Sequence, residues 1–186
     1  PCPINEYGRQ KAMTEAGVLA LDPRNLVLRT SGAYGWQWEP KNFVLQIRKN
    51  LSEGRPMRVA ADISYNPTYV ENLAEITAAL VAAQASGIFH AVGAEEIARY
   101  DFAVRVAKAF GLDHKLLQPT PAAQLGSPTP RPKASSLRTD KVRAAVSVQP
   151  IGVDEGLRRM LAMEASWRAY ARTLPDPAAK VAPSRR

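Results

Sequence analysis

The sequence predicts an α/β fold with a parallel sheet. Short apolar runs alternate along the chain with longer segments in which apolar residues recur every three or four positions. The first apolar run, 26–30, ends in the polar residues Arg29 and Thr30. An apolar run with a polar end is typical of a buried parallel strand whose carboxyl end lies at a ligand crevice. Strands that alternate with helices in this way favour crossover connections and parallel pairing.

The predicted elements have recognisable starts and stops. Gly54 and Gly87 follow two apolar stripes, where glycine ends a helix in a left-handed cap. Thr68 and Glu71 have the spacing of a capping box, which predicts a helix beginning at Thr68. We expect the following order: helix 6–21, strand 26–30, glycine-rich loop 31–36, helix 42–53, strand 57–60, loop 62–67, helix 68–85, strand 88–92, helix 99–110, edge strand 115–118, proline-rich loop 119–132, helix 139–145, helix 153–174 and a disordered tail over 175–186.

Composition excludes several classes of protein. The 186 residues are enough for one sizeable core, and no apolar run reaches the ~18 residues that a membrane span needs. A single cysteine, Cys2, allows neither an internal disulfide nor a cysteine metal cluster, so we expect no metal site. The net charge of +8 is dispersed and accompanies no nucleic-acid motif. We therefore expect a cytoplasmic protein with no nucleic-acid or membrane partner.

Tyr7 and Lys11 are the first candidates for catalysis. Their spacing of four places both side chains on one face of a helix, one turn apart. A phenol is normally a poor acid or base at neutral pH, and a fixed ammonium nearby favours the phenolate. Such a pair can exchange a proton with a carbonyl or carbinol oxygen. The spacing alone also occurs by chance on many solvated helices, so its context must decide.

The context resembles a known family. Residues 3–11 read Pro-Ile-Asn-Glu-Tyr-Gly-Arg-Gln-Lys, which resembles the active-site helix P-x-N-x-Y-G-x-x-K of extended short-chain dehydrogenases/reductases. Residues 29–35 are similar to the R-T-S-W-V-Y-G segment of the dTDP-4-dehydrorhamnose reductase group. Further matches follow in the same order as far as about Arg159: Asn42-Phe43-Val44, Pro67-Thr68, Gly87-Ile88-Phe89-His90, Phe102-Ala103 and Arg131-Pro132.

This resemblance implies the C-terminal part of a Rossmann-like, doubly wound parallel sheet, together with a small substrate-binding α/β subdomain. Residues 1–35 would end the NAD(P)-binding domain, and 36–174 would form the substrate-binding region, interleaved with the last Rossmann strands. No G-x-x-G-x-x-G motif follows a strand in these residues. We therefore expect a dinucleotide-binding half upstream, and we expect the 186 residues alone to be inactive.

The resemblance also implies a mechanism. NADPH or NADH would deliver a hydride to C4 of a nucleotide-linked 4-keto sugar, and Tyr7 would give the oxygen its proton. Lys11 would make the phenol a better proton donor and hold the nicotinamide ribose, so both residues also contact the cofactor. Thr30 and Ser31, at the end of the first strand, would meet the nicotinamide or the substrate.

Three residues are expected at the substrate, and two of them, Asn42 and Arg131, have an alternative role. Asn42 would donate to the diphosphate, or else cap a helix. Arg131 would pair bidentately with the diphosphate, or else be a solvated loop arginine. Gly32 stands where the reductases carry a tryptophan against the sugar, and Trp36 and Trp38 lie near enough in sequence to fill part of that space.

Two other functions stay open on the same fold. One is a non-catalytic NADP- or nucleotide-binding regulatory subunit, like that of methionine adenosyltransferase. The other is a nucleotide-sugar epimerase or dehydratase. A serine or threonine about two dozen residues before Tyr7 would support an enzyme. The resemblance is also compatible with a homodimer.

Overall fold

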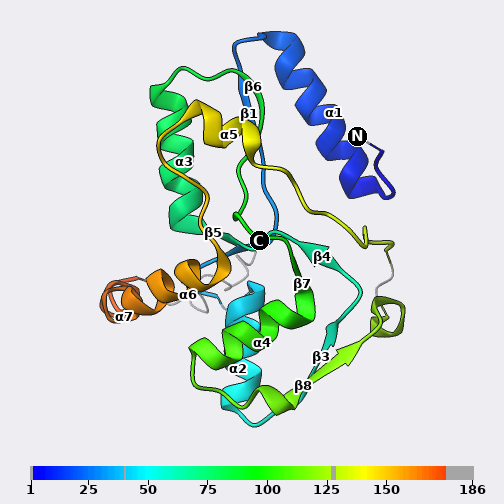
Figure 1. Ribbon diagram of the computed structural model, residues 1–186, viewed down its shortest axis with the longest axis vertical. Helices are drawn as coiled ribbons and strands as arrows, with labels where there is room; N and C mark the ends of the chain where they lie inside the picture. The colour runs from blue at the N-terminus through cyan, green and yellow to red at the C-terminus, as the bar shows by residue number, and fades with distance from the viewer. Residues whose placement is uncertain (1, 40, 127–128, 175–186) are drawn as a thin grey trace, which may run out of the picture.

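The computed structural model describes residues 2–39, 41–126 and 129–174, so the predicted tail over 175–186 lies outside the described residues (Figure 1). The elements are, in order, α1 (Glu6–Leu21), β1 (Leu26–Arg29), β2 (Ala33–Tyr34), α2 (Phe43–Ser52), β3 (Met57–Ala60), β4 (Ser64–Tyr65), β5 (Thr68–Tyr69), α3 (Val70–Ala82), β6 (Gly87–His90), β7 (Ile97–Ala98), α4 (Arg99–Ala109), the 3₁₀ turn His114–Leu116, β8 (Leu117–Thr120), the 3₁₀ turn Ala122–Leu125, α5 (Asp140–Ala145), α6 (Val153–Ala162) and α7 (Glu164–Ala171).

The strands form four pairs among the described residues. Three pairs are parallel, β1 with β6, β2 with β5 and β3 with β8, and the β4–β7 pair is antiparallel. The predicted α/β class with parallel pairing is therefore confirmed. The parallel partners are separated in sequence by whole helices, as crossover connections require.

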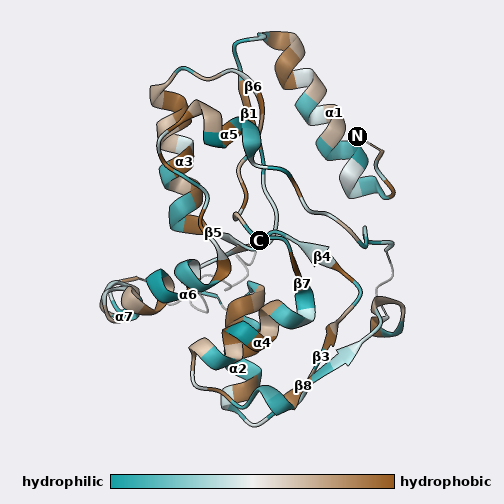
Figure 2. Ribbon diagram, in the orientation of Figure 1, coloured by the Kyte–Doolittle hydropathy of each residue, from teal (hydrophilic) through white to brown (hydrophobic). Residues whose placement is uncertain are grey.

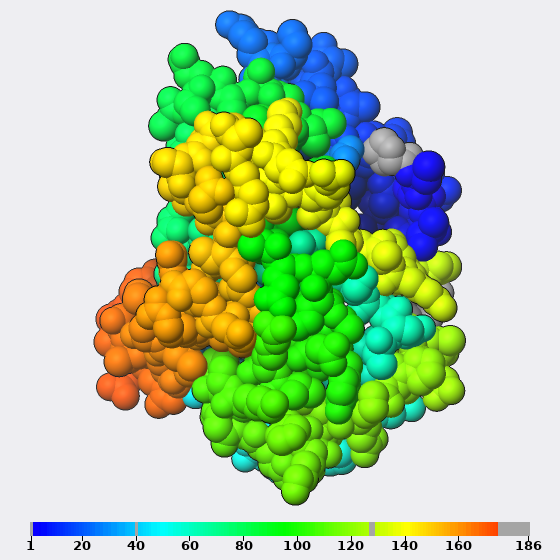
Figure 3. Space-filling model, in the orientation of Figure 1, coloured from blue at the N-terminus to red at the C-terminus, as the bar shows by residue number. Residues whose placement is uncertain are grey.

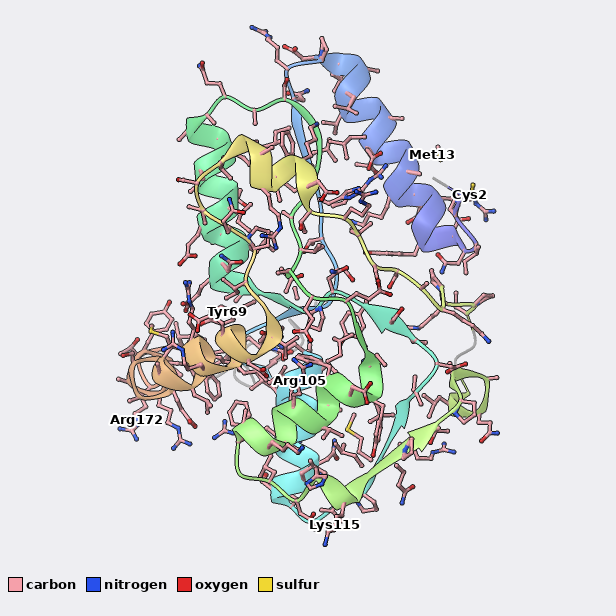
Figure 4. The ribbon with its side chains drawn as sticks, viewed as in Figure 1. Cys2, Met13, Tyr69, Arg105, Lys115 and Arg172 are labelled. Atoms are coloured by element: carbon pink, nitrogen blue, oxygen red, sulfur yellow. The ribbon has the colours of Figure 1, made fainter. Side chains whose placement is uncertain are left out.

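Two apolar clusters form the core. The larger one joins α2, α4, α6 and β3 and includes residues of the short strands β4, β5 and β7. The smaller one joins α3, β6 and α5 (Figure 1). Tyr69, at the end of β5, lies where the two clusters meet (Figure 4). A Cβ atom at Gly156 of α6 would lie 3.2 Å from the Tyr69 Cβ atom and 2.1 Å from the Tyr34 hydroxyl, so only glycine lets α6 approach these two tyrosines this closely.

The domain boundary expected at residue 35 stays a prediction.

Helix α1 stands apart from both clusters. Apolar and polar residues are mixed along it (Figure 2), and none of its side chains is buried. The helix lies at the edge of the molecule (Figures 1 and 3), and Met13, labelled in Figure 4, is 73% exposed. Apolar burial within the described residues therefore contributes little to its position.

The capping box predicted at Thr68 is wrong. Helix α3 begins at Val70, with Tyr69 as an N-cap that makes no side-chain cap bond. Thr68 instead lies in β5, where it pairs with Ala33 of β2. Its hydroxyl donates to the carbonyl of Ser31 (2.6 Å) and accepts from the backbone N–H of Gly93 (3.1 Å). The pairing with β2 keeps the backbone extended for two more residues than the sequence pattern indicated.

Three further boundaries differ from the predictions. The expected helix 153–174 is divided at Met163, whose N–H bonds two carbonyls as α6 ends, and α7 begins at the next residue. Glu164 then pairs with Arg48 of α2 at 2.6 Å, which ties α7 to the larger core. The loop expected over 62–67 contains β4, and the edge strand lies at Leu117–Thr120 instead of 115–118.

We predict that Thr68→Val destabilises the protein more than Thr68→Ser. Valine preserves the volume but leaves the Gly93 N–H without its hydroxyl acceptor, and an unpaired buried donor costs about 1–3 kcal/mol. Serine keeps the hydroxyl and removes one methyl group, which costs about 0.8 kcal/mol. Denaturant unfolding measures both changes. A valine variant at least as stable as the serine variant would contradict this role of the hydroxyl.

Candidate active site

Tyr7 and Lys11 share one face of α1, as their spacing predicts. The Lys11 ammonium lies 5.5 Å from the centroid of the Tyr7 ring, and Tyr7 is 70% exposed. Asn5 is the N-cap of this helix, because its Oδ1 accepts the backbone N–H of Gly8 at 2.8 Å. The phenol and the ammonium are thus held together at the N-terminal end of the helix, open to a ligand.

Polar contacts hold α1 in place. Glu15 lies one turn beyond Lys11, and its carboxylate receives two hydrogen bonds from Arg29 at the end of β1, of 2.6 and 2.8 Å. These bonds lower the pKa of Glu15 below its ordinary value of 4.5. Asn25 donates to the carbonyl of Val18 at 2.8 Å and fixes the other end of the helix. The helix that carries Tyr7 is therefore tied to the strand that leads into the glycine-rich loop.

Arg29 also joins the next strand. Its Nη1 atom lies 3.5 Å from Nε2 of His90, the last residue of β6. His90 Nδ1 donates to the carbonyl of Arg138 at 3.0 Å, since a carbonyl oxygen can only accept. The carboxyl ends of β1 and β6 are thus connected through side chains. The sequence places His90 in an apolar strand but gives no sign of this contact.

The loop after β1 contains Thr30, Ser31 and Gly32. Thr30 is exposed and Ser31 is half-buried, and the Ser31 carbonyl is engaged by the Thr68 hydroxyl at 2.6 Å. Gly32 has φ +53°, and a Cβ atom there would lie 2.2 Å from Cε2 of Tyr65. The Tyr65 ring therefore occupies the place that a side chain at position 32 would take. This contact explains the glycine, and sequence reasoning missed Tyr65.

Trp36 does not fill the space beside Gly32. Its indole N–H donates to the carbonyl of Met160 at 2.6 Å, and its ring meets Phe110 edge-on at 6.1 Å. That expectation is wrong for Trp36, because the ring is used in the larger core. Trp38, on the same loop, is 37% exposed.

The two polar residues expected at the diphosphate have different surroundings. Asn42 caps α2: its Oδ1 accepts the N–H of Leu45 at 3.1 Å and its Nδ2 donates to the carbonyl of Gly35 at 2.8 Å. The capping alternative is thus confirmed for Asn42. Arg131 is exposed, and the preceding carbonyl, of Pro130, accepts from Asn5 Nδ2 at 2.9 Å. This bond brings the Arg131 loop to the N-terminus of α1.

A polar cavity of about 310 Å³ opens beside the loop that contains Arg138. Its lining residues are Asn66, Ala94, Glu96, Ser136, Leu137, Arg138, Thr139 and Asp140. The Ser136 hydroxyl is buried and has no hydrogen-bond partner in the part of the chain that the structure describes. Asn66 shapes the wall by accepting from the Leu137 N–H at 2.8 Å and donating to the Gly93 carbonyl at 3.1 Å. The lining of this cavity is therefore mainly polar.

Comparison with known proteins decides the family. The model of the RmlD substrate binding domain matches residues 1–166. The chain belongs to this family. In the part of the chain that the structure describes, no helix is long and apolar enough to cross a membrane, and no group of acidic, histidine or cysteine side chains could hold a metal ion.

Several relatives of this RmlD-family chain are named as reductases. The chain is 28% identical to the probable low-salt glycan biosynthesis reductase of Haloferax volcanii, over 92% of this chain and 57% of that protein. It is 33% identical to the dTDP-4-keto-6-deoxy-D-glucose reductase of Streptomyces niveus, over 77% of this chain and 49% of that protein. The chain thus spans about half the length of these curated relatives.

A solved structure shows the same fold. The dTDP-4-dehydrorhamnose reductase of Bacillus anthracis, in complex with NADP, superposes with a TM-score of 0.81 at 27% identity. The match covers 87% of this chain and 57% of that chain. The expected Rossmann-like α/β fold is therefore confirmed.

We predict that Gly32→Ala destabilises the protein more than Gly111→Ala. Both glycines have positive φ, +53° and +65°, so alanine at either position costs about 1–2 kcal/mol of backbone strain. Nothing lies within 4 Å of a Cβ atom at Gly111, whereas one at Gly32 would overlap the Tyr65 ring. Thermal unfolding of the two variants measures the loss of stability in each, and the difference between the two losses is the cost of the contact with the Tyr65 ring. Equal losses would contradict this prediction, because they would show that the Tyr65 ring moves aside at no cost in stability.

Proposed function

We propose that the protein is an NAD(P)-dependent reductase of a nucleotide-linked 4-keto sugar, of the dTDP-4-dehydrorhamnose reductase type. One observation carries the proposal: Tyr7 and Lys11 are paired on a helix that Glu15 and Arg29 tie to the end of β1. The reductase names of the relatives support the same reaction class. The NADP in the Bacillus anthracis structure supports NADPH as the hydride donor, with NADH as the alternative.

The reaction divides between cofactor and protein. The nicotinamide, when bound, supplies a hydride to C4 of the sugar, and the carbonyl oxygen then needs a proton. Tyr7 donates this proton from its phenol as a general acid. The Lys11 ammonium, 5.5 Å from the ring, stabilises the phenolate that remains and is placed to hold the ribose hydroxyls. Water can return the proton to Tyr7, since the residue is 70% exposed.

The other site residues have supporting roles in this proposal. Thr30 and Ser31 face the nicotinamide or the sugar from the end of β1, and Gly32 allows Tyr65 to border that position. Arg131 meets the diphosphate with an exposed guanidinium. The Asn42 amide is engaged on both sides, so we assign it to holding the loop before α2 on the substrate side.

The remaining expectations stay predictions. A regulatory subunit without catalysis and an epimerase or dehydratase would each use this fold, and turnover of a 4-keto sugar with net oxidation of NADPH distinguishes a reductase from both. The homodimer and the cytoplasmic location also stay predictions.

We predict that Tyr7→Phe in the full-length protein lowers kcat by ~10²–10⁴-fold, because general acid catalysis contributes that much. NADPH affinity should change little, since only the hydroxyl is removed. The assay follows NADPH absorbance with a dTDP-linked 4-keto sugar, and NADPH titration measures binding. Tyr170→Phe removes the hydroxyl of another exposed tyrosine, on α7, and should leave turnover unchanged. Full turnover in Tyr7→Phe would refute the catalytic role.

A further inference from the structure

Arg99, the first residue of α4, holds its guanidinium between two aromatic rings. Its Cζ atom lies 3.7 Å from the centroid of Phe43, on α2, and 5.7 Å from that of Tyr65, on β4. The backbone N–H of Arg99 donates to the carbonyl of Ile63 at 2.9 Å, which fixes the start of the helix. Three elements therefore hold this side chain in one place.

The guanidinium of Arg99 has no anion. Within the described ranges it forms neither an ion pair nor a side-chain hydrogen bond, and its charged neighbour is a second cation, Arg131. Burial, and to a lesser extent Arg131, lower the pKa of Arg99. Other partly buried arginines differ from Arg99 in facing carboxylates: Arg29 with Glu15, Arg48 with Glu164, Arg105 with Glu95 and Arg159 with Glu155.

This arrangement is costly without a ligand. A guanidinium removed from water loses hydration, and a nearby cation adds repulsion. Phe43 lies against the guanidinium, 3.7 Å from its Cζ atom to the ring centroid, and arginine binds phosphate oxygens in pairs through the N–H groups at the edges of its plane. A dianion placed between Arg99 and Arg131 would relieve both costs.

The position of Arg99 relates it to the candidate active site. Tyr65, which the guanidinium contacts, is also the ring that fills the space beside Gly32. Arg131 follows Pro130, whose carbonyl holds Asn5 at the start of the Tyr7 helix. An anion bound by both arginines is therefore connected through direct contacts to the loop after β1 and to α1.

We propose that Arg99, together with Arg131, binds the diphosphate of the nucleotide-linked substrate. The identity of the anion rests on the proposed function, whereas the existence of an anion site rests on the unpaired guanidinium. Arg99 begins α4 and Arg131 lies in the loop after residue 129, so two separate segments of the chain would contact the diphosphate. Phe43 and Tyr65 are positioning residues that hold the planar guanidinium of Arg99 in place.

Titration calorimetry with thymidine diphosphate, inorganic pyrophosphate and thymidine tests the proposal in the full-length protein. Arg99→Gln should lower the affinity for thymidine diphosphate and for pyrophosphate by about 10–100-fold, which is the contribution of a hydrogen bond to a charged group. The affinity for thymidine should not change. The salt dependence of thymidine diphosphate affinity should also become shallower. Arg58→Gln is the matched control: it removes one charge from an exposed β3 arginine, whose one side-chain hydrogen bond within the described ranges is to the Gln124 carbonyl at 3.5 Å. This variant should bind all three ligands as the wild type does.

Wild-type affinity for both diphosphates in Arg99→Gln would overturn the proposal, as would a wild-type protein that binds thymidine diphosphate no better than thymidine. If Arg99→Gln does not fold, Arg99→Lys decides. Lysine keeps the charge but loses the planar fork, so diphosphate affinity should fall with thymidine affinity intact, and unchanged diphosphate affinity overturns the assignment.

The two proposals fail separately. The anion site would stand without the reductase function if Arg99→Gln lost affinity for pyrophosphate while the wild type reduced no 4-keto sugar. The reductase function would stand without the anion site if the wild type reduced the keto sugar while Arg99→Gln bound diphosphates as tightly as the wild type.

Discussion

The ion pair between Glu15 and Arg29 is the interaction on which the candidate active site depends. Helix α1 buries none of its side chains, so apolar packing among the described residues does not fix its rotation or its height along β1. The two hydrogen bonds of the ion pair hold the middle of the helix against the end of β1, and the bonds of Asn5 and Asn25 hold its two ends. Glu15 is 16% and Arg29 32% exposed in their side chains, so water screens this pair less than it screens a surface pair. Tyr7 and Lys11 lie on the same face of the helix as Glu15 and are oriented with it.

Two further constraints shape the loop that follows β1. The Thr68 hydroxyl bridges the Ser31 carbonyl and the Gly93 N–H, so the ends of β1 and β6 are held from β5. Tyr65 closes the space beside Gly32 and also contacts Arg99. The position of the reacting groups and the position of the unpaired guanidinium are thus set by one connected group of contacts. In the proposed function, this group aligns the sugar with Tyr7 while the diphosphate is held farther away.

Local sequence signals predicted several local features correctly. Asn5 and Asn42 cap helices as their positions indicate, and short apolar runs such as Leu26–Arg29 pair in parallel. The errors fall where a distant contact overrides a local pattern. Thr68 has the spacing of a cap but pairs with β2, and Trp36 lies near Gly32 in sequence but bonds to Met160. The aromatic pair around Arg99 joins residues from three elements, and no periodicity within one segment could indicate it.

A double-mutant cycle on turnover tests most directly whether the Glu15–Arg29 pair positions Tyr7. Glu15→Gln and Arg29→Gln should each lower kcat in the full-length protein, and the double variant should lose no more than the worse single variant, because both changes break the same contact. The exposed pair Asp22–Arg24, at the other end of α1, provides the control, and its disruption should leave kcat unchanged. Wild-type turnover in the single variants, or losses that multiply in the double variant, would contradict the account.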